Sequence, residues 1–239
     1  MSQRPAPHAG FSLVELLIVL LIVVVLTSLL MPGLRAVRET ANRLGCASNL
    51  RQIGCAITVY STDHDERLPF SYFGSPEIQQ YSEMMALTTG GGPTASNSMD
   101  GLGRLLPRAG HYLDCAGCMF CPSHRGEHTI ERYQATLDNP WASSERAFSN
   151  YHYRGDVDSE SGVRYRFSND HSFLLAADGL RTKSDFNHGN GLNLLHGDLA
   201  VTWLSDTDGS LIGSLPEAPA EFQPPVFDEL WTDLVKVEK

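Results

Sequence analysis

The sequence predicts an α+β protein in which one long N-terminal α-helix packs on an antiparallel β-sheet head. Three observations predict this fold class: an almost wholly apolar run from Phe11 to Met31, an amphipathic pattern over 32–67, and five short strand-like runs later in the chain. Gly, Asp and Asn separate these runs, which is the pattern of antiparallel hairpins. We expect the helix to be transmembrane in its first half and kinked near Pro32, because proline removes a backbone hydrogen bond.

The composition fits one membrane anchor followed by one ordinary domain. The chain has 239 residues, with 28 acidic and 18 basic side chains and a net charge of −10. Proteins that bind nucleic acid neutralise phosphates with clustered Lys and Arg. Because the chain is acidic, we expect no nucleic-acid partner. We interpret the negative net charge as a feature that keeps the protein soluble.

The apolar run is long enough to cross a lipid bilayer. About 20 helical residues at ~1.5 Å each span a hydrocarbon core of ~30 Å. A cleaved secretory signal has an apolar region of only ~7–15 residues and an Ala-x-Ala site after it, which this chain lacks. A plain anchor does not explain Glu15, because a carboxylate in a spanning helix costs about 2.5–3.5 kcal/mol at the centre and less near an end. Glu15 thus indicates a partner of opposite charge, unless it is solvated at headgroup depth.

The stretch "GFSLVELLIVLLIVVVLTSLLMPG" resembles the N-terminus of type IV pilins and type II secretion pseudopilins. The resemblance implies that residues 1–10 are a leader, which prepilin peptidase removes by cleavage between Gly10 and Phe11. Phe11 would then be N-methylated, and residues 11–31 would be the transmembrane helix. It also implies that Glu15 neutralises the terminal amine of a neighbouring subunit and that Pro32 bends the helix.

The same resemblance implies partners and a location. The partners are prepilin peptidase, other pilin or pseudopilin subunits and an inner-membrane assembly platform. Arg4 and the absence of acidic residues in the leader favour retention of this end in the cytoplasm. We therefore expect a single-pass protein of the bacterial inner membrane with its head on the periplasmic or extracytoplasmic side.

Residues 32–67 predict the amphipathic half of the long helix. One apolar stripe has Leu50, Ile53, Ile57 and Tyr60, and an earlier one has Leu34, Val37, Ala41 and Leu44. The run "CASNLRQIGCAITVYSTDHDERLP" and the later "FCPSHRG" resemble a large pilin-like bacterial family with poorly characterised heads. We expect a β-rich head over 68–215 and a Pro-rich, mostly extended arm over 216–239, with a short helix around 227–234.

The five cysteines leave three interpretations open: disulfides, a metal site and free thiols. Cys46 and Cys55 cannot bond to each other, because nine helical residues place them ~13.5 Å apart on opposite faces. The run "CAGCMFC" has a spacing that suits zinc, with His111, His124 or His128 as the fourth ligand. Disulfides, however, form readily outside the cytoplasm. If a disulfide joins the helix to the head, the family landmarks imply Cys46 with Cys121. Cys115 and Cys118 are then candidates for a second pair, which would leave Cys55 buried and free.

The segment "NHGNGLNLLHGDLAVTW" carries a second family resemblance, with matches at His188, Gly189, Asn193, Asp198 and Trp203. Leu199 stands where the family has Gly, so Gly197 would take over the tight turn. One interpretation is a hairpin in which His188 bonds a buried carboxylate or carbonyl. A second is a bound cation, Ca²⁺ or Zn²⁺, held by Asp178, His188 and Asp198. Two acidic loops, 156–162 and 206–209, have calcium-like spacing or are solvated turns.

We interpret the chain as a pilin-like structural subunit of a type IV pilus or type II secretion-like filament, with no cofactor and no catalysed reaction. One alternative is a membrane-tethered binding module that does not polymerise. Another is a metal-dependent enzyme built on His188, His196 and Asp198. No phosphate loop, nucleophile elbow or His-Glu-x-x-His pattern supports an enzyme.

Overall fold

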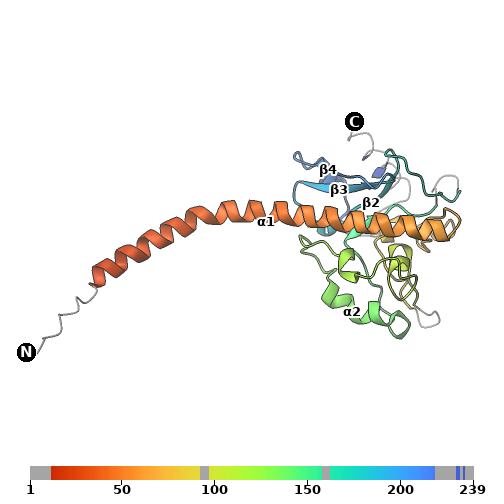
Figure 1. The fold of residues 1–239 in the computed structure, drawn as a ribbon, viewed down its shortest axis with the longest axis horizontal. Helices are drawn as coiled ribbons and strands as arrows, with labels where there is room; N and C mark the ends of the chain where they lie inside the picture. Colours follow the sequence, from red (N-terminus) through yellow and green to blue (C-terminus); the bar gives the residue numbers. More distant parts are fainter. Residues whose placement is uncertain (1–11, 92–96, 158–161, 219–229, 232–233, 235–239) are drawn as a thin grey trace, which may run out of the picture. The chain divides into compact units, whose positions relative to one another are not determined.

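A computed structural model describes residues 12–91, 97–157, 162–218, 230, 231 and 234. It confirms the α+β class, with a long N-terminal helix and a four-stranded antiparallel sheet (Figure 1). The chain divides into two compact units, residues 1–41 and 42–239. Helix α1, Leu13–Asp63, has 51 residues and contributes to both units. It is unbroken at Pro32, and the kink expected there stays a prediction.

In the first unit, residues 16–31 of α1 are apolar on almost every side. The large apolar side chains from Leu13 to Met31 are between 48% and 80% exposed. The hydroxyl of Thr27 donates to the carbonyl oxygens of Val23 and Val24, at 2.9 and 3.0 Å, so this polar side chain is satisfied within the helix. The surface of this segment therefore offers almost no polar group to water.

The sheet of the second unit is a meander whose order follows the chain. Its strands are β1 (Tyr151–Tyr153), β2 (Leu174–Asp178), β3 (Gly191–His196) and β4 (Val201–Ser205), and all neighbours are antiparallel. Four of the five predicted strand runs are thus strands, whereas 163–168 forms only isolated bridges. Every residue of β2 and β3 is buried, so both faces of these two strands are covered.

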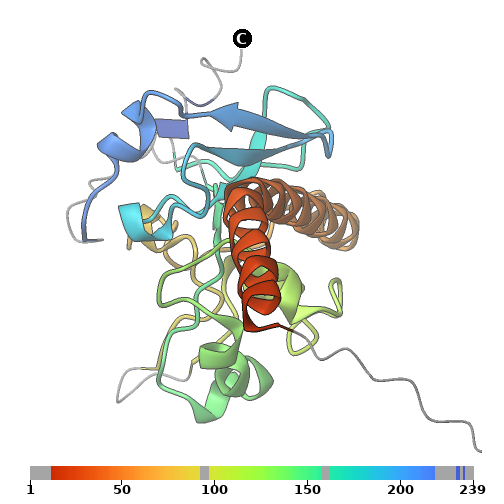
Figure 2. The same cartoon turned by 90° about the vertical axis from the view of Figure 1, so that its left-hand side faces the viewer.

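The later part of α1 covers one face of the sheet. Leu50, Ile53 and Ile57 are fully buried, which confirms the second predicted stripe. A Cβ atom at Gly54 would lie 3.0 Å from the side chains of both Leu195 and Leu199, so the glycine permits the close approach of helix and strand. Figures 1 and 2 show the sheet on one side of this part of α1 and α2 (Ile130–Asp138) on the other.

One expectation about packing was wrong. Leu34, Val37 and Leu44, from the first predicted stripe, are 64%, 67% and 63% exposed, so the described part of the chain does not cover these side chains. In the described part of the chain, the named strands all lie within 151–205. The head before them has turns, isolated bridges, α2 and the short 3-10 helices η1 (Tyr81–Glu83), η2 (Gly101–Leu105), η3 (Ala116–Met119) and η4 (Pro140–Ala142). The chain then forms η5 (Lys183–Asp185) and α3 (Ser210–Ser214).

The described part of the C-terminal arm does not extend away from the head. Leu230, Trp231 and Leu234 belong to the main hydrophobic core and are 8%, 3% and 1% exposed. The ring of Trp231 meets the edge of the buried His152 ring, with 6.0 Å between centroids. The expected helix around 227–234 lies mostly outside the described residues.

Candidate functional site

The start of α1 is a capping box that our sequence analysis did not recognise. The backbone N–H of Ser12 donates to Oε2 of Glu15 at 2.9 Å, and the N–H of Val14 donates to the Ser12 hydroxyl at 3.3 Å. The pattern Ser-x-x-Glu ahead of an apolar run is the sequence signature of this cap. Glu15 therefore has a local partner in the single chain. Gly10 and Phe11, the predicted cleavage position, lie outside the described residues.

The part of α1 that follows this cap is long enough and apolar enough to cross a membrane. Its most apolar window of 18 residues has a mean hydropathy of 3.1, and no part of that window is buried within the chain. An apolar surface of this extent requires lipid or other protein chains to cover it. Glu15 is thus an acidic group at the beginning of a long, uncovered apolar surface.

A disulfide joins Cys46 on α1 to Cys121, with 5.3 Å between the two Cα atoms. This is the pairing that the family resemblance implied. It connects α1 to the segment that follows η3, across 75 residues of sequence. Both cysteines are buried, at 0% and 5% exposure.

The other cysteine expectations were wrong. Cys115 and Cys118 are free thiols. The Cys118 thiol instead lies 3.3 Å from Oε1 of Gln52, and burial raises its pKa to about 12. Cys55 is free, as expected, but exposed, because it lies on the face of α1 opposite Cys46.

The histidines proposed as zinc ligands for "CAGCMFC" have other neighbours. His124 Nδ1 lies 2.9 Å from the Asn187 side-chain oxygen, and His128 Nδ1 lies 2.7 Å from the Tyr133 hydroxyl. His111 lies 3.8 Å from Asp114 at the surface. Within the described chain, a different group has its ligand atoms within 4.8 Å of one another, and it comprises Cys46, Cys121, Asp178 and His188. We call this group the buried cluster.

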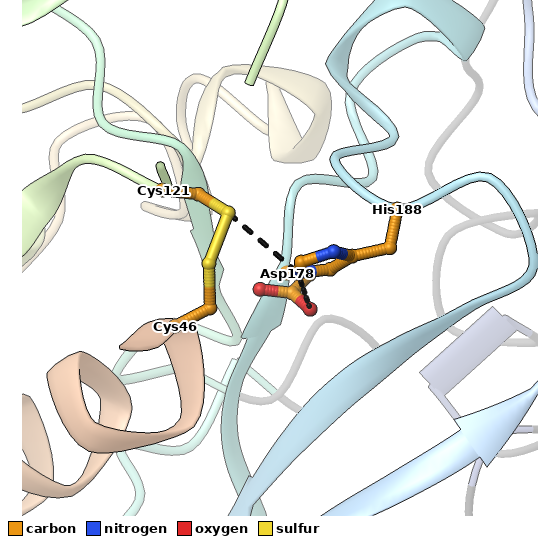
Figure 3. A group of neighbouring side chains, drawn as sticks. All are labelled: Cys46, Cys121, Asp178 and His188. Atoms are coloured by element: carbon orange, nitrogen blue, oxygen red, sulfur yellow. Dashed lines mark hydrogen bonds and ion pairs between the residues drawn. A yellow bond between two sulfur atoms is a disulfide. The ribbon is translucent and has the colours of Figure 1, made fainter. Parts of the chain in front are cut away.

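The buried cluster brings together four segments of the chain (Figure 3). Asp178 ends β2, and His188 lies between η5 and β3. His188 Nε2 is 3.5 Å from Oδ2 of Asp178 and 3.6 Å from Sγ of Cys121. Figure 3 shows the four side chains directed toward a common centre, with Cys46 on α1.

The environment of Asp178 is set by burial and by Asn193. The carboxyl group is fully buried, which raises its pKa from 3.8 to about 6, while His188 and Asn193 oppose the shift. Oδ2 accepts hydrogen bonds from the backbone and side-chain nitrogens of Asn193, at 2.6 and 3.0 Å. Oδ1 is buried and has no hydrogen-bond partner in the described part of the chain. The rings of His188 and Trp203 meet in a T-shaped arrangement, with 5.6 Å between their centroids.

The structure brings together only two of the three residues predicted to hold a metal. Asp198 is exposed, and its Oδ2 lies 2.8 Å from Nδ1 of His171. His196 is bonded to the backbone oxygen of His171 at 2.6 Å and to the Thr202 hydroxyl at 2.8 Å. His188 and His196 lie at opposite ends of β3, which is ~17 Å long at ~3.3 Å per residue. The set His188, His196 and Asp198 therefore does not form one site.

The acidic loop at 206–209 and the turn before β4 have structural roles. The two carboxylate oxygens of Asp206 accept the backbone N–H groups of Leu211 and Ile212, both at 2.9 Å, at the start of α3. Leu199 has a positive φ of 67°, so it takes the left-handed turn position that we expected Gly197 to provide. The loop at 156–162 lies partly outside the described residues.

A buried ion network was not indicated by any sequence motif. Glu83 is 8% exposed and forms ion pairs with Arg146 and Arg181. His128 lies 3.5 Å from Asp185 beside this group. The members come from distant parts of the chain without regular spacing, so no local signal identifies them.

Comparison with known proteins identifies the N-terminal half. Residues 6–31 match the model of the prokaryotic N-terminal methylation motif. Residues 35–107 match a family described as a protein of unknown function, DUF1559. The competence protein ComGC of Halalkalibacterium halodurans is 37% identical over 68 residues, which are 28% of this chain and 66% of that protein. The N-terminal part of this chain is therefore similar to type IV pilin-like proteins.

A second relative of the pilin-like chain is the ComG operon protein 3 homolog of Bacillus licheniformis. It is 30% identical over 60 residues, which are 25% of this chain and 62% of that protein. The pilin-like chain thus spans somewhat less than two thirds of the length of both relatives. No solved structure matches it. Its methylation motif and apolar helix make it a membrane-anchored protein.

Proposed function

We propose that this chain is a structural subunit that assembles, through the apolar part of α1, into a type IV pilus or a type II secretion-like filament. Before assembly, prepilin peptidase would cleave between Gly10 and Phe11, and Phe11 would be N-methylated. The subunit would then pack against other pilin or pseudopilin subunits, delivered by an inner-membrane assembly platform. The observation that carries the proposal is the exposed apolar part of α1, residues 13–31, with the carboxylate of Glu15 in its first turn.

The physical argument concerns the partner of Glu15. A buried carboxylate and a buried ammonium group each cost several kcal/mol alone and much less when paired. In the described part of the single chain, Glu15 accepts a hydrogen bond from the backbone N–H of Ser12. Cleavage before Phe11 creates a positive amine at the same depth in the neighbouring subunit. Exchange of the local cap for this ion pair would favour one axial register between subunits, which a purely apolar helix cannot specify.

The head would lie outside the cytoplasm. The buried disulfide between Cys46 and Cys121 supports this side of the membrane, because structural disulfides persist in oxidising compartments. Arg4 in the leader supports the same orientation. We propose a structural role rather than an enzymatic one, since His188, His196 and Asp198 do not share a site.

The deciding experiment replaces Glu15 in cells that carry the assembly machinery. We expect Glu15→Ala to insert into the membrane and to be processed normally but to be lost from sheared filaments by at least tenfold, the ratio that corresponds to about 1.4 kcal/mol. Glu39→Ala, on the same helix after the apolar part, is the matched control and should assemble normally. Normal filament incorporation of Glu15→Ala would instead support the non-polymerising tether.

Processing is tested separately by mass spectrometry of the mature chain. We expect a protein that begins at Phe11 and carries one methyl group on its N-terminal amine. A chain that retains Met1 in cells with an active prepilin peptidase would contradict the proposal.

A further inference from the structure

The buried cluster contains the ligand types of a zinc site. Two cysteine sulfurs, one imidazole nitrogen and one carboxylate oxygen lie within 4.8 Å of one another, and all four residues are buried. Structural zinc is held in tetrahedral geometry by this kind of set, in which thiolates and imidazoles predominate. In the present state, the disulfide occupies both sulfurs and prevents them from acting as thiolate ligands.

Two distances in the cluster match edges of a zinc tetrahedron, and its ligand atoms all lie within 4.8 Å of one another. Zinc bonds of ~2.3 Å to sulfur and ~2.0–2.1 Å to nitrogen and oxygen give edges of ~3.6 Å between sulfur and nitrogen and ~3.4 Å between nitrogen and oxygen. The corresponding distances are 3.6 Å between Cys121 Sγ and His188 Nε2, and 3.5 Å between His188 Nε2 and Asp178 Oδ2. The sulfur–sulfur edge, which is ~3.8 Å in such a site, is shorter here because the two atoms are bonded.

The surroundings of the cluster suit a bound cation. Asp178 is fully buried, and its Oδ1 has no hydrogen-bond partner among the described residues. Asn193 holds the other oxygen through two hydrogen bonds, as outer-shell groups do for metal-ligating carboxylates. A buried carboxylate oxygen without a partner is costly, and a cation at the centre of the cluster would satisfy it.

We propose that reduction of the Cys46–Cys121 disulfide converts the buried cluster into a zinc site with Cys46, Cys121, Asp178 and His188 as ligands. A dithiol would supply the two electrons and two protons, becoming a disulfide itself while Cys46 and Cys121 become thiols. Zn²⁺ would then displace the two thiol protons, which pass to solvent. Either state links α1 to the segment at Cys121, and the zinc state also links both to β2.

The test measures zinc on the full-length chain in detergent, in its oxidised form and after reduction with a phosphine, which leaves no competing thiol. We use a variant with Cys55→Ser, Cys115→Ser and Cys118→Ser, so that the cluster cysteines are the only thiols. After incubation with Zn²⁺ and desalting, we expect about one zinc per reduced chain and none on the oxidised chain. Equal zinc on both forms, or none on the reduced form, would overturn the proposal.

Ligand identity is tested by cobalt and by substitution. The reduced chain with Co²⁺ should show charge-transfer absorption from two thiolates. A spectrum without this absorption would refute Cys46 and Cys121 as ligands, and this measurement does not depend on whether the ligand variants fold. We expect Asp178→Asn and His188→Gln to weaken zinc binding at least about tenfold. The control His171→Gln, at the exposed pair with Asp198, should bind zinc as the parent does. Unchanged affinity in both cluster variants would also overturn the proposal.

Discussion

Removal of the Cys46–Cys121 disulfide should destabilise the head by several kcal/mol. The bond closes 75 residues of sequence, for which the chain-entropy model gives roughly 4.5 kcal/mol at 25 °C. Measured losses for native disulfides span about 2–5 kcal/mol. For a domain of this size, we expect Cys46→Ala with Cys121→Ala to lower the melting temperature by roughly 10–15 °C.

The assay is urea unfolding of the full chain in detergent, followed by tryptophan fluorescence. Trp231 is 3% exposed in the core and Trp203 packs under Arg43, with 4.2 Å between the guanidinium carbon and the ring centroid, so both report on the head. Cys55→Ala is the control, because this thiol is exposed and free. A loss below about 1 kcal/mol for the double variant, or an equal loss for the control, would refute the loop-closure argument.

Three further predictions concern buried groups of the head, and urea unfolding measures each. Burial raises the pKa of Asp100 from 3.8 to about 6, so the folded state binds this proton more tightly than the unfolded chain, and the stability of the head falls as the pH rises from 4 to 6. Asp100→Asn should reduce that fall by up to about 3 kcal/mol. An unchanged pH dependence of stability in this variant would contradict the argument. Gly54→Leu should cost about 1–3 kcal/mol by overpacking against Leu195, and a neutral result would show that the helix can shift. Glu83→Gln should cost about 3 kcal/mol because the mostly buried Arg181 loses its counter-charge, and a loss below 1 kcal/mol would mean that water reaches the network.

Periodicity explains which elements the sequence could predict. The long helix and four strands have uniform patterns, either a continuous apolar run, a repeat of three and four residues, or short β-prone runs between turn residues. Residues 68–150 have no such repeat, because their core side chains come from turns and 3-10 helices whose positions depend on tertiary contacts. The exposure of Leu34 and Leu44 has the same origin, since a stripe indicates an apolar face but not what covers it.

The candidate site was predictable only in part, because strand register decides which side chains meet. Ala177 pairs with Leu194, and Asp178 therefore receives the hydrogen bonds of Asn193 and lies at the His188 end of β3. His196, at the other end of the same strand, is placed with His171 instead. Residue types identified the ligand candidates, but spacing alone could not separate these two ends of the strand.

The cap and the disulfide lie in different parts of α1, so a substitution at one of them can affect assembly or head stability without affecting the other. Glu15 lies in the first turn of α1, within the unit of residues 1–41, and Cys46 lies near the beginning of the unit that contains the head. The covalent bond therefore fixes the head to α1 at the end where the packed part of the helix begins and where local unfolding would otherwise start. Any load carried along the apolar part of α1 then reaches the head through a covalent bond as well as through side-chain packing.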